Sequence, residues 1–515
     1  MMPRPARPLL LLLLLTSARL TADDLEPTNR FYAEEAARLA ALPYAPGFQP
    51  PTAFARNLNY DALRNIRIQR QHCLFNESAG NLRVEPRLAG SFNSKGIQLN
   101  LLQDGLSHPV PFKASFFKFP QDITTPGEND LPGYGGFRVL GPTNTGGPVY
   151  EQFTFGGASY FRGHPDTLNY GLSARGLILR KSGKEEFPLF ERFAFEEPAP
   201  QSSQLVWHAL LNSPSTTGAF RFHSTPGSPA IMEVHADIFL RAGLRWDDVG
   251  IGLAGFSSMF WFSPASARRT ADFRERVHDS DGLAVATTSG EHFWRVLTNP
   301  AKLRHSSFPI QGLSGFGLIQ RERSFAAYED EVARYERRTS AWVIPLKGMT
   351  SGRIKLLEIP TANEYNDNIV AFFEPETPPA PGEPLRIAYR LMWCDDVPAD
   401  TGSPPARIVQ TRVGQLPDKS GITLLTVDFA SASIDPLPIP EIQMPSGLKK
   451  QFAYLKPLPD GKTTRLHLGV LPEDSGTDAN QNGNTGEIRV RLVREGKPVS
   501  ETWIYPWSGV PRPAP

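Results

Sequence analysis

Residues 231–240 read Ile-Met-Glu-Val-His-Ala-Asp-Ile-Phe-Leu. Apolar and polar side chains alternate along most of this stretch, which is the period of a β-strand with one face in a core. A second run of this kind opens with Arg353-Ile354-Lys355-Leu356. From about residue 80 onward, short alternating runs are separated by Gly, Pro, Asn and Asp, which interrupt strands. The pattern predicts a mainly β protein of packed sheets rather than a series of βαβ units.

Composition agrees with a chain rich in turns and strands. The 515 residues include 43 Gly, 49 Pro and 32 Phe. The 54 Lys and Arg residues nearly balance the 53 Asp and Glu residues, so the formal charge is +1. A nucleic-acid-binding protein would show a basic excess, and we therefore expect no nucleic-acid partner. One amphipathic helix is predicted from Phe31 to Leu42, ended by Pro43.

The first 22 residues have the pattern of a secretory signal peptide. Arg4 and Arg7 precede a run of seven leucines, Leu9 to Leu15, and small residues follow at Thr16-Ser17-Ala18. Removing residues 1–22 takes away three arginines and no acidic residue, so the charge changes from +1 to −2. We therefore expect a periplasmic or extracellular protein.

Two domains are expected after the signal segment. The first, residues 23–394, is long enough to form a cleft and should carry the function. A run rich in Pro, Asp and Gly at residues 395–406 is typical of a linker. Residues 407–515 alternate again, as in Leu466-His467-Leu468, and their number suits a smaller immunoglobulin-like sandwich.

Three features leave alternatives open. Cys73 and Cys394 could form a disulfide or remain as two buried thiols. Glu233, His235 and Asp237 share one face of a strand and could hold a metal, although a solvated strand face explains them better. Residues 478–484 copy the first half of a calcium loop, but a hairpin turn between residues 466–470 and 487–493 explains the composition better.

Glycine pairs provide little evidence for a phosphate site. Gly135-Gly136 and Gly156-Gly157 do not stand between a strand and a helix, which is the context that a phosphate-binding loop requires. No HExxH motif, CxxC pair or GxSxG motif occurs in the sequence.

Two acidic loops are better candidates for chemistry. One runs from His278 to Gly282 before a strand, and the other runs from Asn363 to Asn368 before the apolar run 369–373. Two carboxyl groups brought together from strand ends are what a glycosidase needs, one as acid and one as base. Aromatic residues at 260–262, 293–294 and 342 could stack on sugar rings. Asp and Asn are also common turn formers, so spacing alone does not settle their role.

The same segments resemble the periplasmic osmoregulated glucan biosynthesis proteins of the G and D type. The likeness covers nearly the whole chain after the signal segment, with its blocks in a fixed order. The matching blocks are Gly157–Arg162, Tyr170–Leu177, Gly183–Phe187, Ser257–Phe260, His278–Ser280, Gly315–Arg321, Ser340–Val343, Glu358–Thr361, Asn366–Ala371 and Ser500–Trp503.

This resemblance implies a fold and an activity. The fold would be a large galactose-mutarotase-like β-sandwich followed by a smaller immunoglobulin-like β-sandwich. Some family members act as inverting endo-β-1,2-glucanases, which would make Asp367 the general acid and Asp279 the general base. Burial or the neighbouring Glu364 would keep the acid protonated. The resemblance implies β-1,2-glucan as substrate, no metal and no cofactor.

Further residues are assigned to the cleft by the same resemblance. They are expected to bind substrate and are Tyr170, Arg175, Trp294, Arg295, Glu364 and Tyr365. Two positions depart from the family pattern, because Asn363 stands where an acid is frequent and Asp281 where an Asn is frequent.

The sequence also leaves three questions of function open. The enzyme could hydrolyse or transfer glucan chains. The protein could instead be a non-catalytic glucan-binding protein that assists the inner-membrane glucan glucosyltransferase in backbone release or branching. The oligomeric state is open too, and the resemblance is compatible with a homodimer.

Overall fold

The computed structural model describes most of the chain in detail. The described residues are 30–77, 82–91, 93–143, 148–266, 272–380, 382–398, 406–417, 421–430, 436–473 and 486–507. The predicted signal peptide, the calcium-like loop at 478–484 and residues 399–405 of the predicted linker lie outside them.

Three short α-helices lie near the N-terminus of the described chain. They are α1 (Arg30–Ala40), α2 (Ala53–Asn57) and α3 (Tyr60–Asn65). Helix α1 confirms the predicted amphipathic helix, and its buried Tyr32 and Ala36 pack on Ala194, Leu210 and Ala219. None of the helices in the described ranges has the length and apolar character that spanning a membrane requires.

Strands dominate the rest of the structure, which confirms a mainly β protein. The first large sheet has 11 strands in the described chain. Its members are β2 (Arg83–Leu88), β6 (Tyr134–Gly141), β7 (Tyr150–Gly156), β8 (Tyr160–Gly163), β9 (Ser173–Arg175), β10 (Ile178–Lys181), β11 (Lys184–Glu186), β16 (Val249–Ser258), β21 (Arg304–Gln311), β24 (Ser351–Glu358) and β25 (Ile369–Pro375).

The second large sheet has 15 strands in the same described ranges. Its members are β3 (Gln98–Gln103), β4 (Leu106–Pro109), β12 (Leu189–Glu196), β13 (Leu205–Asn212), β14 (Thr216–Thr225), β15 (Ala230–Leu240), β19 (Gly282–Thr287), β20 (His292–Val296), β22 (Leu313–Ile319), β23 (Ser340–Lys347), β26 (Leu385–Cys394), β29 (Ile439–Gln443), β32 (Gly486–Arg494), β33 (Lys497–Pro498) and β34 (Thr502–Trp507).

The two large sheets share one hydrophobic core. Phe137 and Phe155 of the first sheet meet Phe193 and Trp207 of the second, with ring centroids 5.0 Å apart for Phe137–Phe193 and 5.4 Å for Phe155–Trp207. All four side chains are buried, and burying each contributes on the order of 1.5–3 kcal/mol. Strand β15 alternates buried and partly buried residues along its length, as the sequence 231–240 predicts.

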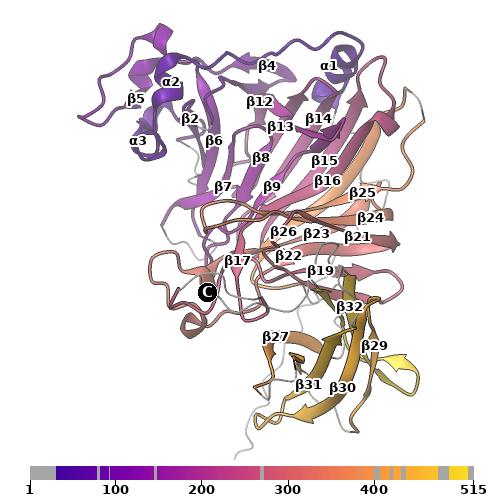
Figure 1. Cartoon of the computed structure of the whole chain (residues 1–515). Coiled ribbons are helices and arrows are strands. Elements are labelled where there is room, and N and C mark those ends of the chain that lie inside the picture. Colours follow the sequence, from indigo (N-terminus) through magenta and orange to yellow (C-terminus); the bar gives the residue numbers. More distant parts are fainter. Residues whose placement is uncertain are drawn as a thin grey trace, which may run out of the picture.

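The last part of the chain adds a third sheet and a second core. The four-stranded sheet contains β27 (Arg407–Gln415), β28 (Thr423–Ala430), β31 (Thr463–Pro472) and β30 (Leu448–Pro457). Its inner side chains, such as Val427 and Leu468, belong to one buried cluster with Val490 and Trp503 of the second large sheet. These strands form the lower body in Figure 1, beneath the two large sheets.

Strand pairing continues across the predicted domain boundary. Strand β34 lies parallel to β20, with Trp294 opposite Trp503. Strand β32 in turn pairs with β34, so the second large sheet runs from the first part of the chain into the last. The boundary at 395–406 falls between β26 and β27. The two named sandwich types and the domain limits stay predictions.

Two expectations about loops and cysteines have clear outcomes. The predicted hairpin between residues 466–470 and 487–493 is wrong, because β31 and β32 belong to different sheets. Cys73 and Cys394 are free and buried, in separate core clusters. Burial raises the pKa of the Cys73 thiol to about 11, which keeps it neutral.

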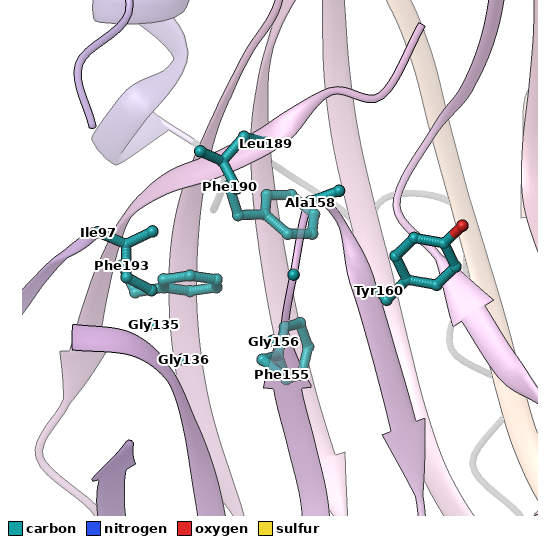
Figure 2. Close-up of a pocket in the computed structure, with 11 residues that line it drawn as sticks. Ile97, Gly135, Gly136, Phe155, Gly156, Ala158, Tyr160, Leu189, Phe190 and Phe193 are labelled. Atoms are coloured by element: carbon teal, nitrogen blue, oxygen red, sulfur yellow. The ribbon is translucent and has the colours of Figure 1, made fainter. Parts of the chain in front are cut away.

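The glycine pairs noted in the sequence lie where strands approach closely. Gly136 of β6 faces Gly156 of β7, and a Cβ on Gly136 would lie 2.2 Å from the carbonyl oxygen of Phe155. Figure 2 labels Gly135, Gly136 and Gly156 around the rings of Phe155, Phe190 and Phe193. Together with Gly157, these residues line a small apolar cavity. Their surroundings therefore indicate packing between strands.

Candidate functional site

Both predicted aspartates lie at strand ends and are anchored to the same short segment. Asp279 stands between β18 (Val277–His278) and β19, and its backbone N–H donates to the Met259 carbonyl at 2.9 Å. Asp367 precedes β25, and the side chain of the next residue, Asn368, bonds both backbone groups of Phe260, at 2.8 and 3.0 Å. The fold therefore brings together two loops that are 88 residues apart in sequence (367 − 279 = 88).

Asp279 is a buried carboxyl group with a perturbed pKa. Its Oδ1 lies 3.3 Å from Nε of Arg338, and only 8% of the residue is exposed. Burial raises the pKa of Asp279 to about 6, the nearby Arg338 charge opposes that rise, and Asp367 adds to it. A carboxyl group of this kind changes its charge near neutral pH, which makes it a candidate for acid–base chemistry.

Asp367 has the opposite environment. The residue is exposed, so the expectation that its carboxyl group would be buried is wrong. Its charge acts on two neighbours, raising the pKa of both Asp279 and Tyr160. The two carboxyl groups thus lie within electrostatic reach of each other, one buried and one facing solvent.

Glu364 is held by protein groups beside this pair. The Tyr335 hydroxyl donates to Glu364 Oε2 at 3.1 Å, and Arg274 Nη1 lies 2.9 Å from the same oxygen. The charge of Glu364 raises the pKa of Asp279. Its neighbour Tyr365 is 85% exposed, which leaves the ring free to stack on a ligand.

An open depression adjoins Arg274. It has a volume of about 480 Å³ and is lined by residues 272–274 and 329–332. Arg274 pairs with Asp330, another lining residue, at 2.6 Å. Phe273 and Val332 expose apolar surface there, 75% and 90% respectively. The depression therefore combines charged groups with apolar surface, and Arg274 connects it to Glu364.

Tyr170 and Arg175 both belong to the surroundings of the pair. The carbonyl oxygen of Tyr170 accepts a hydrogen bond from Arg338 at 2.6 Å, and its hydroxyl donates to Glu151 at 2.7 Å. Arg175 lies over the ring of Tyr160, 4.8 Å from its centroid, and donates to Ser257 at 2.7 Å. Arg175 is almost fully buried, and its guanidinium contacts Glu185 as well as Tyr160 and Ser257.

Trp294 and Arg295 are buried against other strands, so the expectation that they line an open cleft is wrong. Trp294 is buried against the C-terminal strands, where Arg321 lies over its ring at 3.7 Å. Arg295 is completely buried and pairs with Glu358 at 2.8 Å and Glu487 at 3.1 Å. Both residues connect the second large sheet to its neighbours.

The strand face with Glu233, His235 and Asp237 is occupied by arginines. Arg390 lies 2.7 Å from Glu233, and Arg386 lies 3.8 Å from Asp237. Within the described ranges, no three His, Cys, Asp or Glu side chains are grouped so that they could hold a metal ion. The solvated, charge-paired strand face is therefore the better interpretation.

Three residues near the aspartates were missed by sequence reasoning. Arg338 and Tyr335 lie around a short 3₁₀ turn at 335–337, which has no periodic signal. Tyr160 stands inside one of the blocks that carry the family resemblance, and only that block could have indicated it. The remaining contacts of the site join distant segments, which a single sequence does not reveal.

The fold and the site together define a large mainly β protein with a carboxylate-rich, solvent-open site. The chain belongs to the family described as "Periplasmic glucan biosynthesis protein, MdoG", whose model matches residues 30–507. The protein therefore has a role in periplasmic glucan biosynthesis.

Curated relatives cover nearly the whole chain. "Glucans biosynthesis protein G" of Rhodopseudomonas palustris is 37% identical over 480 residues, which are 92% of each chain. The protein of the same name from Shewanella sp. strain MR-4 is 35% identical over 477 residues, covering 92% of this chain and 85% of the relative. These values bear out the family resemblance.

Proposed function

We propose that this protein is an inverting endo-β-1,2-glucanase, or a related transglycosylase, acting in the periplasm on the β-1,2-glucan backbone. One observation carries the proposal. A buried carboxyl group with a pKa of about 6, Asp279, lies within electrostatic reach of an exposed one, Asp367. Pairs of carboxyl groups in different environments are how glycosidases separate the acid from the base.

Asp279 is the general base in this proposal because the family resemblance assigns it that role; its raised pKa alone would fit an acid as well as a base. Above pH 6 its carboxylate draws a proton from the attacking water, directly or through a water chain, while that water bonds to the anomeric carbon. Asp367 is the general acid and gives its proton to the departing glycosidic oxygen as the carbon–oxygen bond breaks. In transglycosylation, a sugar hydroxyl replaces the water.

Substrate binding would prepare the carboxyl group of Asp367 to act as the general acid. A glucan chain lying over Asp367 removes water from its carboxyl group, and loss of water favours the protonated form. The exposed ring of Tyr365 offers a stacking face two residues away. Tyr170, Arg175 and Glu364 then shape the site around the chain.

Turnover of defined glucans tests the proposal. Purified protein is incubated with linear β-1,2-glucan for a day, with laminarin and cellulose as controls, and chain lengths are measured. Shorter, longer or cyclised β-1,2 products are expected, with the controls unchanged. Inverted configuration of the released anomeric centre, observed by proton NMR, would separate the inverting from the retaining mechanism. An unchanged length distribution would reject the enzyme.

A binding protein is the second candidate, because the carboxyl group of Asp367 is exposed and not buried as the general acid was expected to be. Such a protein would receive glucan from the inner-membrane glucan glucosyltransferase and assist backbone release or branching. It predicts glucan affinity without turnover in the wild type and the same affinity in Asp367→Asn. Secretion through residues 1–22 and assembly as a homodimer are proposed for both candidates.

The pH dependence of the enzyme should report Asp279. Activity requires the ionised base, so kcat/KM should rise with pH through about 6. Arg338 lowers the pKa of Asp279, and its removal should raise that pKa. In Arg338→Gln we therefore expect the rising limb to move to higher pH by about one unit.

The adjacent Arg337 provides the control for this shift. Arg337 is exposed and donates to the Thr167 carbonyl at 2.9 Å, away from Asp279. Arg337→Gln should leave the rising limb in place. Equal profiles for both variants would contradict the role given to Asp279.

A further inference from the structure

The loop that carries Asp279 is held by the side chain of Asp281. Asp281 Oδ2 accepts two backbone hydrogen bonds, from Arg321 at 2.6 Å and from Glu322 at 2.9 Å. Its own N–H donates to the Ile319 carbonyl at 2.8 Å, and its carbonyl accepts from Leu297 at 3.1 Å. Asp281 therefore ties the loop both to the end of β22 and to the residue after β20.

The same carboxylate reaches a buried histidine on the other side of Asp279. His278 has no exposed surface, and its Nε2 lies 3.2 Å from Asp281 Oδ1. The other ring nitrogen, Nδ1, lies 2.9 Å from Gln320 Oε1. Gln320 Nε2 donates to two carbonyls, those of His278 and Tyr335, so its oxygen must accept and Nδ1 must carry a hydrogen.

The contact between His278 and Asp281 is a close approach inside the protein. Burial lowers the pKa of His278, and the nearby charge of Asp281 opposes that fall. The other charged groups that face His278 are Arg276 and Glu322. Asp279 thus stands between two residues that face each other across the loop.

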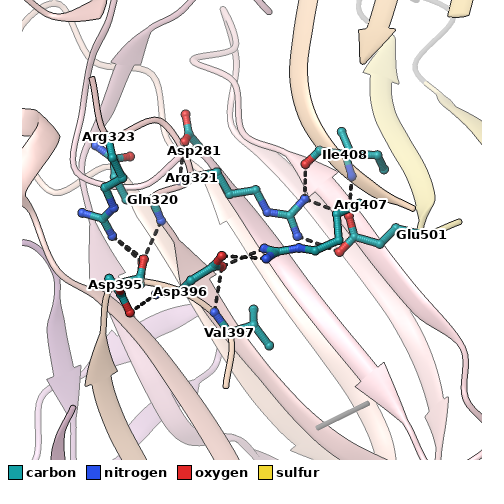
Figure 3. A network of polar contacts seen from close by, with 11 residues as sticks. Asp281, Gln320, Arg321, Arg323, Asp395, Asp396, Val397, Arg407, Ile408 and Glu501 are labelled. Atoms are coloured by element: carbon teal, nitrogen blue, oxygen red, sulfur yellow. Dashed lines mark hydrogen bonds and ion pairs between the residues drawn. The ribbon is translucent and has the colours of Figure 1, made fainter. Parts of the chain in front are cut away.

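The C-terminal strands reach this loop through one arginine. The guanidinium of Arg321, the residue whose N–H holds Asp281, forms a double ion pair with Glu501 at 2.7 and 2.8 Å. Glu501 stands just before β34 and also accepts from the Ile408 N–H at 2.8 Å. Both side chains are only 6% exposed. Figure 3 shows Arg321 between Asp281 and Glu501.

We propose that Asp281 is a positioning residue that holds Asp279 in its buried place, and that Glu501 supports it from the C-terminal strands through Arg321. The inference rests on the proposed function, because it assigns a part to residues around the base. It also gives the C-terminal part of the chain a role in the site rather than in stability alone.

Two substitutions of Asp281 separate positioning from folding. Asp281→Asn keeps an oxygen for the two backbone N–H groups and has nearly the same size beside His278. Asp281→Ala removes all these bonds. We expect kcat to fall at least tenfold in Asp281→Ala with little change in KM, and to return to within about threefold of wild type in Asp281→Asn.

The pH profile gives a readout that a general loss of stability would not move. When the loop loosens in Asp281→Ala, water reaches Asp279 and its pKa falls toward the ordinary value. The rising limb of kcat/KM should therefore move below pH 6 in Asp281→Ala and stay near 6 in Asp281→Asn. An Asp281→Asn variant as impaired as Asp281→Ala, or an Asp281→Ala variant equal to wild type, would overturn the proposal.

A second ion pair at the same junction is the matched control for Glu501. Arg407 pairs with Asp396 at 2.6 Å, close to Glu501 but without a bond to Asp281 (Figure 3). Glu501→Gln should lower kcat several-fold, whereas Asp396→Asn should leave kcat unchanged. Equal kcat in the two variants would remove Glu501 from the proposal.

Hydrogen–deuterium exchange keeps the test independent of turnover. Faster exchange of residues 277–282 is expected in Asp281→Ala and Glu501→Gln but not in Asp396→Asn. If the wild type shows no turnover, the proposed function fails, while the exchange result still decides whether Asp281 holds the loop. If the wild type is active and exchange is unchanged in Asp281→Ala, the positioning role fails alone.

Discussion

Replacing Asp279 by Asn should lower the turnover of linear β-1,2-glucan by at least about 10²-fold. Asn has nearly the same size but cannot accept a proton from the attacking water, and positioned proton transfer contributes at least about this factor. Chain-length analysis under single-turnover conditions measures the effect. Glucan affinity should be retained, because the substitution removes no bulk from the site.

The same variant should not be less stable above pH 6. The pKa of Asp279 is raised from 3.8 to about 6, so its contribution to stability is present below pH 4 and is lost as pH rises to 6. A rise of this size corresponds to about 3 kcal/mol of unfavourable free energy for the charged form. Asn removes that charge. The thermal midpoint of Asp279→Asn at pH 7.5 should therefore equal or exceed that of wild type.

Asp367→Asn provides the companion measurement. Asp367 is exposed, so the substitution should leave the thermal midpoint unchanged while turnover again falls by at least about 10²-fold. If activity and stability fell together in both variants, the aspartates would be structural turn residues. Near-normal turnover in Asp367→Asn with intact folding would reject Asp367 as the general acid and favour the glucan-binding protein.

Breaking the Arg295–Glu358 pair should produce the largest loss of stability. Neither side chain has exposed surface, and Glu358 also accepts from the N–H and hydroxyl of Thr298 at 2.7 and 2.9 Å. Arg295→Met leaves the Glu358 charge buried without its cation, which costs about 3–5 kcal/mol. Urea denaturation should show the midpoint falling accordingly.

An exposed ion pair of the same type is the control. Arg491 lies 2.8 Å from Glu441, with about half of each side chain in solvent. Arg491→Met should change the free energy of unfolding by at most about 1 kcal/mol. If Arg295→Met lost no more free energy of unfolding than Arg491→Met, burial would not make the ion pair with Glu358 more important for stability. The double variant Arg295→Met with Glu358→Gln should recover part of the loss, because no buried charge remains.

Strands could be predicted from the sequence because the alternation of apolar and polar residues is a local pattern. Alternation at 231–240 predicts β15, and the run at 353–356 predicts part of β24, since period two places one set of side chains in the core. The hairpin predicted after β31 was wrong because it, too, was based on a local pattern. Local composition predicts a turn, but it does not tell which sheet the next strand joins.

Candidate site residues could be predicted only where they lie in sequence blocks that resemble the family. The blocks around residues 279 and 367 led to two loops that the fold anchors to Met259 and Phe260. Trp294 and Arg295 were misplaced because an aromatic and a cation on a strand look alike whether the strand faces solvent or another layer. Strand β34 near the C-terminus pairs with the strand that carries these residues, and the sequence near position 294 does not predict that pairing.

The sequence by itself determined the mainly β class, the early helix, several strand positions, the family and, through the family blocks, the two candidate aspartates. Each of these depends on local periodicity or on contiguous blocks of residues. The tertiary structure alone decided that Asp279 is the buried carboxyl group and Asp367 the exposed one, and that Arg338 faces Asp279. Burial and the pKa of an ionisable group depend on every chain segment packed around it, and those segments are far apart in sequence.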